Sequence, residues 1–109
     1  MTSKKTAASK RANLPRASDY TKEFLKDWQR LSQSGRYDMN RLKEVMFMLI
    51  ANDGPLAAEW LDHSLKGDWD GFRECHVGGD FLLIYRIDDV GKYGLIVFVR
   101  AGTHSELFT

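Results

Sequence analysis

Residues 78–87 read GGDFLLIYRI, and this stretch decides the fold. Its two glycines and the aspartate are typical of a tight hairpin turn. Residues 81–87 then place apolar side chains on both alternating faces, which is typical of a strand in the middle of a sheet. Residues 69–77 predict the strand before the turn. The sequence therefore predicts an antiparallel hairpin whose second strand is central.

One more strand and a helical turn are predicted at the C-terminal end. After a turn at residues 88–92, a strongly apolar run predicts a strand over residues 93–100. Residues 103–108 predict a short helical turn. Arg100 closes this last strand and His104 follows it, so the two side chains should lie near one end of the sheet.

A first amphipathic helix is predicted upstream of the hairpin. Its apolar residues recur every three or four positions and form one helix face: Tyr20, Phe24, Trp28 and Leu31. Ser18 or Asp19 can cap its start. Residues 14–16 predict a short edge strand ahead of it.

A second helix is predicted to begin at Asp38 or Asn40. Its buried stripe is expected to comprise Leu42, Val45, Met46 and Leu49. The run Met46-Phe47-Met48 is interpreted as core, as is Trp28 in the first helix. The turn residues at 52–55 end the second helix, and residues 56–61 predict one further helical turn.

The predicted fold class is α+β, in the order β-α-α-β-β-β. The two N-terminal helices should pack on one face of a twisted, mainly antiparallel sheet. We expect a basic tail over residues 1–13 and one domain over residues 14–109. Residues 1–16 carry five Lys and Arg and no acid, whereas residues 17–109 carry eleven against fifteen acids, a net charge of −4. A solvated leader is the favoured interpretation of the tail, with nucleic-acid contact as the alternative.

Composition excludes several classes of protein. One cysteine, Cys75, excludes an internal disulfide and fits a reducing compartment. No apolar run approaches the ~20 residues that a membrane span requires, and the basic N-terminus lacks the apolar segment of a secretory signal. We therefore expect a cytoplasmic protein without a membrane partner.

Ionisable side chains gather around the three C-terminal strands. His76 and Asp80 flank the hairpin turn, and an antiparallel last strand can return His104 to the same end. Two histidines and an arginine suffice for RNA cleavage without a metal, because one base, one acid and one cation cover the proton transfers and the phosphorane charge. The alternative is that these histidines only hydrogen-bond to the backbone.

Other chemistries fit the sequence less well. A metal site could use His63, Cys75, His76 or His104, but no ligand motif is present. Neighbours in a strand also point to opposite faces, so Cys75 and His76 should not share a metal. Cys75 is expected to be a small buried residue rather than a nucleophile. Trp60 and Trp69 are expected to pack under loops, with base stacking as the alternative.

Three motifs together resemble the YafQ branch of the RelE/ParE toxin superfamily. Residues 62–77 read DHSLKGDWDGFRECHV, residues 80–87 read DFLLIYRI and residues 100–108 read RAGTHSELF. The likeness lies in a DH-x-L-x-G-x-W-x-G-x-R segment, a CHV-x-x-D turn and a GTH-x-x-LF ending. It runs in order from about Pro15 to the C-terminus and leaves out only the basic tail.

The resemblance implies the toxin of a type II toxin–antitoxin system, which cuts mRNA in the ribosomal A site and is silenced by a cognate antitoxin. It implies no cofactor, and a toxin–antitoxin complex that binds its own operator DNA through the antitoxin. By position, the catalytic set is His63, His76, Asp80 and His104. Arg73 and Arg100 stand where phosphate is held, and Phe108 matches a functional aromatic residue. We expect His104 as acid and His63 or His76, oriented by Asp80, as base.

Two alternatives within the same fold stay open: a non-catalytic toxin that inhibits a protein such as DNA gyrase, and an inactive binding module. The sequence also departs from the family pattern. Phe81 stands where relatives often carry tryptophan, which still permits stacking. The acidic body differs from the basic surface of ribosome-binding toxins, and the basic tail is expected to compensate for it.

Overall fold

A five-stranded sheet organises the protein, which a computed structural model describes over residues 14–88 and 94–108. The sheet order is β1-β5-β4-β3-β2, with strands β1 (Ala17–Tyr20), β2 (His63–Ser64), β3 (Arg73–Gly78), β4 (Phe81–Asp88) and β5 (Leu95–Thr103). β1 runs parallel to β5, and the other three pairings are antiparallel. The predicted α+β class and the central place of β4 are confirmed.

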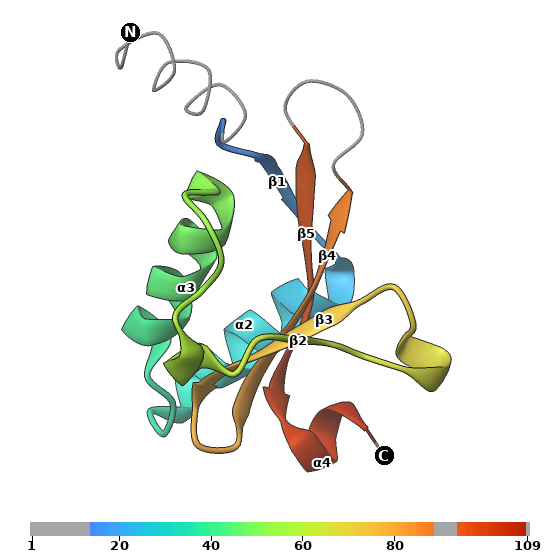
Figure 1. Cartoon of the computed structure of the whole chain (residues 1–109). Helices are drawn as coiled ribbons and strands as arrows, with labels where there is room; N and C mark the ends of the chain where they lie inside the picture. The colour runs from blue at the N-terminus through green and yellow to red at the C-terminus, as the bar shows by residue number, and fades with distance from the viewer. Residues whose placement is uncertain (1–13, 89–93, 109) are drawn as a thin grey trace, which may run out of the picture.

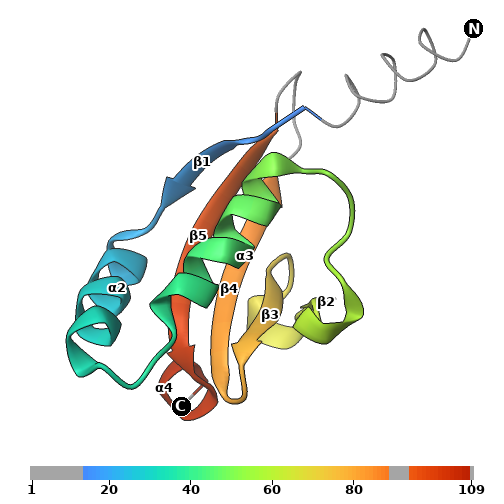
Figure 2. The same ribbon diagram turned by 90° about the vertical axis from the view of Figure 1, so that its left-hand side faces the viewer.

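Two helices, α2 (Lys22–Ser34) and α3 (Met39–Ala51), pack on one face of this sheet (Figure 1, Figure 2). Of the two predicted start residues, Asp38 is the one that caps α3, by accepting a hydrogen bond from the Arg41 amide. Asn52 ends α3 in a left-handed conformation, and its backbone N–H donates to Met48. The sequence thus carries its own start and stop signals for the longer elements.

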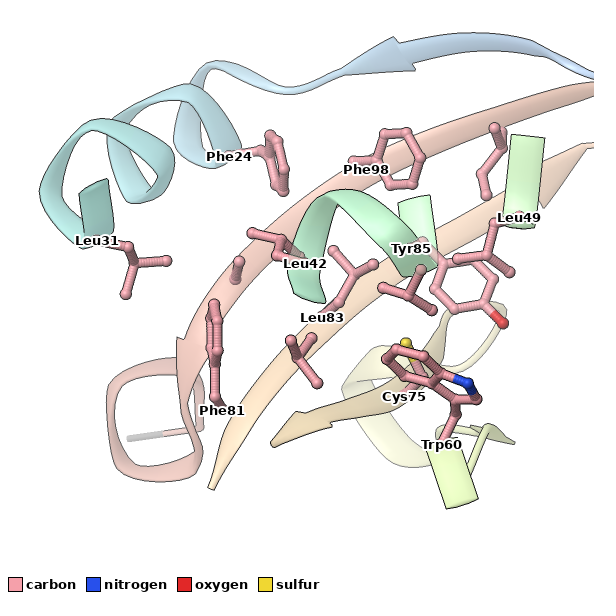
Figure 3. Packing of buried hydrophobic residues seen from close by; sticks show 14 residues of the cluster. Phe24, Leu31, Leu42, Leu49, Trp60, Cys75, Phe81, Leu83, Tyr85 and Phe98 are labelled. Atoms are coloured by element: carbon pink, nitrogen blue, oxygen red, sulfur yellow. The ribbon is translucent and has the colours of Figure 1, made fainter. Parts of the chain in front are cut away.

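The core lies between these helices and the sheet, as Figure 3 shows. Phe24 and Leu31 of α2 and Leu42, Val45 and Leu49 of α3 are buried there. The expected stripes are therefore largely confirmed, although Trp28 and Met46 are only partly buried. The placement of Tyr20 in the helix stripe is wrong, because Tyr20 ends β1 and is 55% exposed. The interpretation of Phe47 as core is wrong, because 70% of its surface is exposed. Phe47 follows Met46 in the chain and lies on the outer side of α3.

The predicted N-terminal edge strand is displaced by three residues. The edge strand comprises Ala17–Tyr20 rather than residues 14–16, so Ser18 and Asp19 belong to β1 and do not cap α2. Thr21 is the cap: its hydroxyl oxygen accepts from the Phe24 amide and its O–H donates to the Val99 carbonyl. Parallel pairing with β5 takes up residues 17–20, and helical spacing alone could not reveal this.

The structure also corrects the region before the hairpin. Of residues 69–77, only those from Arg73 onward form a strand, because Trp69 ends a 3₁₀ turn, η2 (Gly67–Trp69). The two-residue strand β2 was not predicted, since two residues carry no periodic signal. Another 3₁₀ turn, η1 (Ala58–Trp60), agrees with the turn expected at residues 56–61.

The C-terminal elements are close to prediction. β5 extends to Thr103, three residues beyond the expected end, and α4 (His104–Leu107) is the expected helical turn. The predicted turn at residues 88–92 and the basic tail at residues 1–13 lie mainly or wholly outside the described residues. Within the described chain, no helix is long and apolar enough to cross a membrane.

The two faces of the sheet differ in what covers them. The helix face, against α2 and α3, carries Cys75, Val77, Leu83 and Tyr85. The opposite face, called the α4 face below, carries Leu82 and Ile84, on which α4 and the aromatic residues around η2 pack. Because side chains alternate along a strand, Glu74 and His76 lie on the α4 face beside Ile84 and Leu82.

Candidate active site

His63 and His76 meet at one side of the α4 face. Their ring centroids are 6.3 Å apart. His63 comes from β2 and pairs in register with Glu74 of β3, so both lie on the same face of the sheet. The side chain of His63 is half exposed, and its Nε2 lies 2.9 Å from Oε2 of the buried Glu74. The short strand β2 thus brings the first of the predicted histidines beside the second.

His104 and Phe108 occupy the other side of this face, on and just after α4. Their rings lie 4.8 Å apart. The helix starts with a capping box, in which Thr103 and Glu106 exchange hydrogen bonds. Asp80 Oδ1 accepts from the backbone N–H of His104 at 3.2 Å. Asp80 therefore fixes the start of α4 and does not orient the ring of His76 or His63, which was the expected contact.

The strand register sets the separation between these two groups. His76 lies opposite Leu82, and Leu82 lies opposite Gly102. Neighbouring strands are about 4.8 Å apart, so the backbones of His76 and Gly102 are separated by about 10 Å. The side chain of Leu82 therefore forms the floor of this face between the His63–His76 pair and the end of β5, which leads into His104 of α4. The fold thus places His63 beside His76 and Asp80 beside the backbone of His104, as two pairs that lie on either side of Leu82.

An aromatic group borders the site next to α4. The ring of Trp69 lies 5.8 Å from Phe108 and 5.4 Å from Phe72, in both cases edge to face. These three residues pack against the Leu82–Ile84 surface, as expected of Trp69. Phe108 is only partly buried. Phe81, by contrast, is 5% exposed and packs on Tyr37 on the helix face, so it cannot provide the stacking surface expected of it.

Arg100 holds α2, β5 and α4 together rather than standing free at the site. Its Nε and Nη2 donate to the two carboxylate oxygens of Asp27. Arg30 also donates to Asp27 and forms an ion pair with Glu106 of α4. Burial alone would raise the pKa of Asp27, but the hydrogen bonds from Arg100, the Ala101 amide and Arg30 outweigh it and hold that pKa below its ordinary value. This cluster anchors the helix that carries His104.

Arg73 lies on the opposite face of the sheet from His76. It pairs in register with Tyr85, whose side chain is buried on the helix face. Its guanidinium donates to Asp62 and Ser64, and the hydrogen bond to Asp62 raises its pKa further. The fold therefore does not bring Arg73 to the four predicted catalytic residues.

Another arginine does lie on the α4 face. Arg86 alternates with the buried Tyr85 and its side chain is exposed. It stands two residues beyond Ile84 on β4, at the end of the face where His63 and Glu74 lie. The face on which Arg86 lies could be known only once the strand register was fixed.

Cys75, considered above as a nucleophile and as a metal ligand, is buried on the helix face. Burial raises the pKa of the Cys75 thiol to about 12, so this residue is not a thiolate nucleophile. Cys75 and His76 point to opposite faces, as alternation predicted. Over residues 14–88 and 94–108, no three His, Cys, Asp or Glu side chains are grouped to hold a metal ion.

Comparison with known proteins identifies the family. A family model described as "Bacterial toxin of type II toxin-antitoxin system, YafQ" matches residues 16–109. This chain is a member of the YafQ toxin family. The YafQ resemblance seen in the sequence is thereby confirmed.

Relatives in two bacteria support the assignment. The mRNA interferase toxin YafQ of Escherichia coli strain K12 is 43% identical over 90 residues, which are 83% of this chain and 92% of the relative. The toxin in a crystal structure of the E. coli DinJ–YafQ toxin–antitoxin complex has a TM-score of 0.74 at 41% identity, covering 88% of this chain and all of that one. A metal-bound toxin from Helicobacter pylori has a TM-score of 0.74 at 40% identity, covering 85% of this chain and 99% of that one.

Proposed function

We propose that this YafQ family member is a ribosome-dependent endoribonuclease, the toxin of a type II toxin–antitoxin system. One observation carries the proposal: the His63–His76 pair and the start of α4, where Asp80 holds the backbone of His104, lie on either side of Leu82 at the same sheet. A fold that needed these residues only for loop hydrogen bonds would have no reason to collect three imidazoles there. The name of the E. coli relative, an mRNA interferase, points to the same chemistry.

The reaction needs a base at the 2′-hydroxyl and an acid at the leaving 5′-oxygen. His104 serves as the acid, and the base comes from the His63–His76 pair across the floor formed by Leu82. The substrate is RNA, because the nucleophile is the 2′-hydroxyl that DNA lacks. Each proton transfer runs through a histidine, so the mechanism requires no metal from the protein.

The surroundings of the histidines suit a nucleotide. Phe108 offers an aromatic ring beside His104, and stacking of a base on such a ring contributes about 1–3 kcal/mol. Arg86 supplies a cation for the phosphate chain at the far end of the face. Arg73 and Arg100, the predicted phosphate ligands, are engaged by Asp62 and Asp27. We therefore assign Arg100 to positioning α4 and leave Arg73 outside the reaction.

The partners follow from this reaction. The protein acts on mRNA in the ribosomal A site, in the bacterial cytoplasm. A cognate antitoxin silences it, as the E. coli relative is found in complex with DinJ. We also propose that residues 1–13 form a tail and residues 14–109 the toxin domain. The toxin–antitoxin complex binds its own operator DNA through the antitoxin.

The test is to map new mRNA 5′ ends after induction of the wild type and of His104→Ala. The wild type should create ends within translated messages. Loss of a general acid should lower the cleavage rate by about 10²-fold or more. Ser105→Ala, a change at an exposed neighbour on the same helix, is the matched control and should cleave like the wild type.

Two results would contradict the proposal. Growth arrest without new mRNA ends would favour the non-catalytic alternative, inhibition of a protein such as DNA gyrase. Equal cleavage by His104→Ala would remove the central residue from the mechanism. A chain that neither arrests growth nor cuts mRNA would be the inactive binding module.

A further inference from the structure

We propose that Arg73 is a positioning residue, which holds the short strand β2 and thereby sets the place of His63 on the α4 face. The group of side chains that does this, called the β2 clamp below, comprises Arg73, Asp62, Ser64 and Tyr85. This inference deepens the proposed function and rests on it. It gives a role to an arginine that the sequence assigned to phosphate and that the fold turns toward the other face of the sheet.

The strand β2 is too short to fix His63 by its own pairing. It lies at the edge of the sheet, and only His63 and Ser64 pair with β3. One further backbone hydrogen bond follows the strand, from the N–H of Leu65 to the carbonyl of Phe72 at 2.9 Å. Both residues of β2 are exposed, and segments with few buried contacts open locally at low cost in free energy. Side-chain contacts are therefore needed to hold His63 in one place.

Arg73 binds the residues on both sides of His63. Its Nη2 donates to Oδ2 of Asp62 at 3.0 Å, and its Nη1 donates to Oγ of Ser64 at 2.8 Å. Because side chains alternate along an extended chain, these two neighbours point to the helix face while His63 points to the α4 face. The two arms of one guanidinium thus hold the chain on either side of the histidine, and they fix its position along β3.

Tyr85 connects the clamp to the core of the protein. Its side chain is 1% exposed and packs in the cluster that Figure 3 shows, in register with Arg73 on the neighbouring strand. Its phenol O–H donates to Oδ1 of Asp62. Burial and this hydrogen bond raise the pKa of Tyr85, so the phenol keeps the proton that it donates. Asp62 therefore binds a buried donor with one oxygen and Arg73 with the other, and the core is linked to β2.

The ring of His63 is in turn bonded to the backbone that the clamp holds. Its Nδ1 is hydrogen-bonded to the carbonyl oxygen of Leu61 at 2.7 Å. Leu61 has a φ of 49°, a left-handed conformation that is uncommon for a residue with a side chain, and Asp62 follows it directly. Fixing Asp62 therefore also fixes the carbonyl that orients the ring. The clamp thus sets how His63 lies beside His76, which matters whichever of the two rings accepts the proton.

The deciding variant is Arg73→Lys in the full-length protein. Lysine keeps the charge, but its single ammonium does not reproduce the two-armed fork of arginine. The single-turnover rate on ribosomes that carry mRNA should fall about 10- to 100-fold, because a displacement of about 1 Å at a reacting group can cost about 100-fold. The ribosome concentration that gives half-maximal rate should stay unchanged. Arg36→Lys, at an exposed arginine between α2 and α3, is the matched control and should have the wild-type rate.

Two results with Arg73→Lys would overturn the proposal. One is a wild-type rate. The other is a rise in the half-maximal ribosome concentration at an unchanged maximal rate, which would make Arg73 a phosphate ligand after all.

A change at Ser64 tests the clamp at an exposed position, where folding is least affected. Ser64→Ala removes one arm of the clamp and should lower the rate several-fold. Ser64→Thr keeps the hydroxyl and should have the wild-type rate. If Arg73→Lys does not fold, a wild-type rate in Ser64→Ala overturns the proposal by itself.

A double-mutant cycle shows whether the effect runs through His63. In a His63→Gln background, Arg73→Lys should cause no further loss of rate, because the residue that it positions is gone. Tyr85→Phe, which removes the buried donor to Asp62, should behave in the same way. Tyr20→Phe, at a tyrosine that is 55% exposed, is its control and should match the wild type. Full additivity of Arg73→Lys and His63→Gln would place the damage elsewhere and refute the inference.

A spectroscopic readout tests the clamp without any reference to activity. In ¹⁵N-labelled protein, NMR should show that Arg73→Lys shifts and broadens the ring signals of His63. The amide proton of Leu65 should exchange faster with solvent, while the ring signals of His104 stay as in the wild type. Unchanged His63 signals would refute the inference even if RNA is cleaved. If the signals change as expected but the wild type cuts no RNA, the proposed function fails and the clamp stands.

Discussion

Asp27 and Glu74 are the two buried acidic residues of the described chain, and their surroundings are opposite. Asp27 receives hydrogen bonds on both oxygens, from Arg100, Arg30 and the Ala101 amide. Glu74 contacts one histidine and leaves its other oxygen unpaired. The first arrangement is what stability requires of a buried charge. The second is what a site retains for function at some cost in stability.

The largest effect expected from this comparison is on stability at Asp27. Asp27→Ala leaves the partly buried Arg100 without its carboxylate and removes the hydrogen bonds that Asp27 of α2 makes to Arg100 and the Ala101 amide of β5. The free energy of unfolding should fall by about 3 kcal/mol, the scale for breaking a buried ion pair. Chemical denaturation measures it, with Glu44→Ala as an exposed control that should stay within about 0.5 kcal/mol. A loss at Asp27 no larger than that of the control would remove the contrast between the two acids.

A smaller effect is expected in acid. The pKa of Asp27 is lowered in the folded protein from an ordinary value of 3.8, so the folded state binds this proton less readily than the unfolded state. The resulting stability is complete well above pH 3.8 and is lost as pH falls through the folded pKa. The difference in unfolding free energy between the wild type and Asp27→Asn should be constant above about pH 5 and should shrink below about pH 4. A constant difference down to pH 2 would contradict the assignment.

The smallest effect on stability is expected for Glu74→Gln. Because a neutral amide is easier to bury than a carboxyl with an unpaired oxygen, the unfolding free energy should change by less than about 1 kcal/mol. Chemical denaturation of Glu74→Gln beside Asp27→Ala measures this. A loss as large as that of Asp27→Ala would remove the contrast between the two acids.

Much of the fold was accessible from the sequence because its long elements carry periodic signals. The helical stripe from Leu42 to Leu49 and the apolar strand at Phe81 each specify their own type. What the sequence could not provide came from pairing between distant segments. The strand Ala17–Tyr20 exists because β5 lies beside it, and β2 is two residues long.

The same distinction holds for the site. The residue set of His63, His76, Asp80 and His104 came from the motifs, and the fold joins them in two pairs, His63 with His76 and Asp80 with the backbone of His104. The roles of the charged residues depended on which face of the sheet each side chain lies on and on what it binds, and only the strand register reveals this. Arg73 pointed away, Arg100 was engaged by Asp27, and Asp80 met the backbone of His104. Glu74 was visible as an acid beside His76, but its contact with His63 needed β2.

The central claim is that histidines on the α4 face cut RNA by activating its 2′-hydroxyl. The most direct measurement is the chemical identity of the ends that the protein creates in ribosome-bound mRNA. The account predicts a 2′,3′-cyclic phosphate on the upstream fragment and a 5′-hydroxyl on the downstream one, because the neighbouring oxygen is the nucleophile. A 3′-hydroxyl and a 5′-phosphate would mean that water attacks instead, and would contradict it.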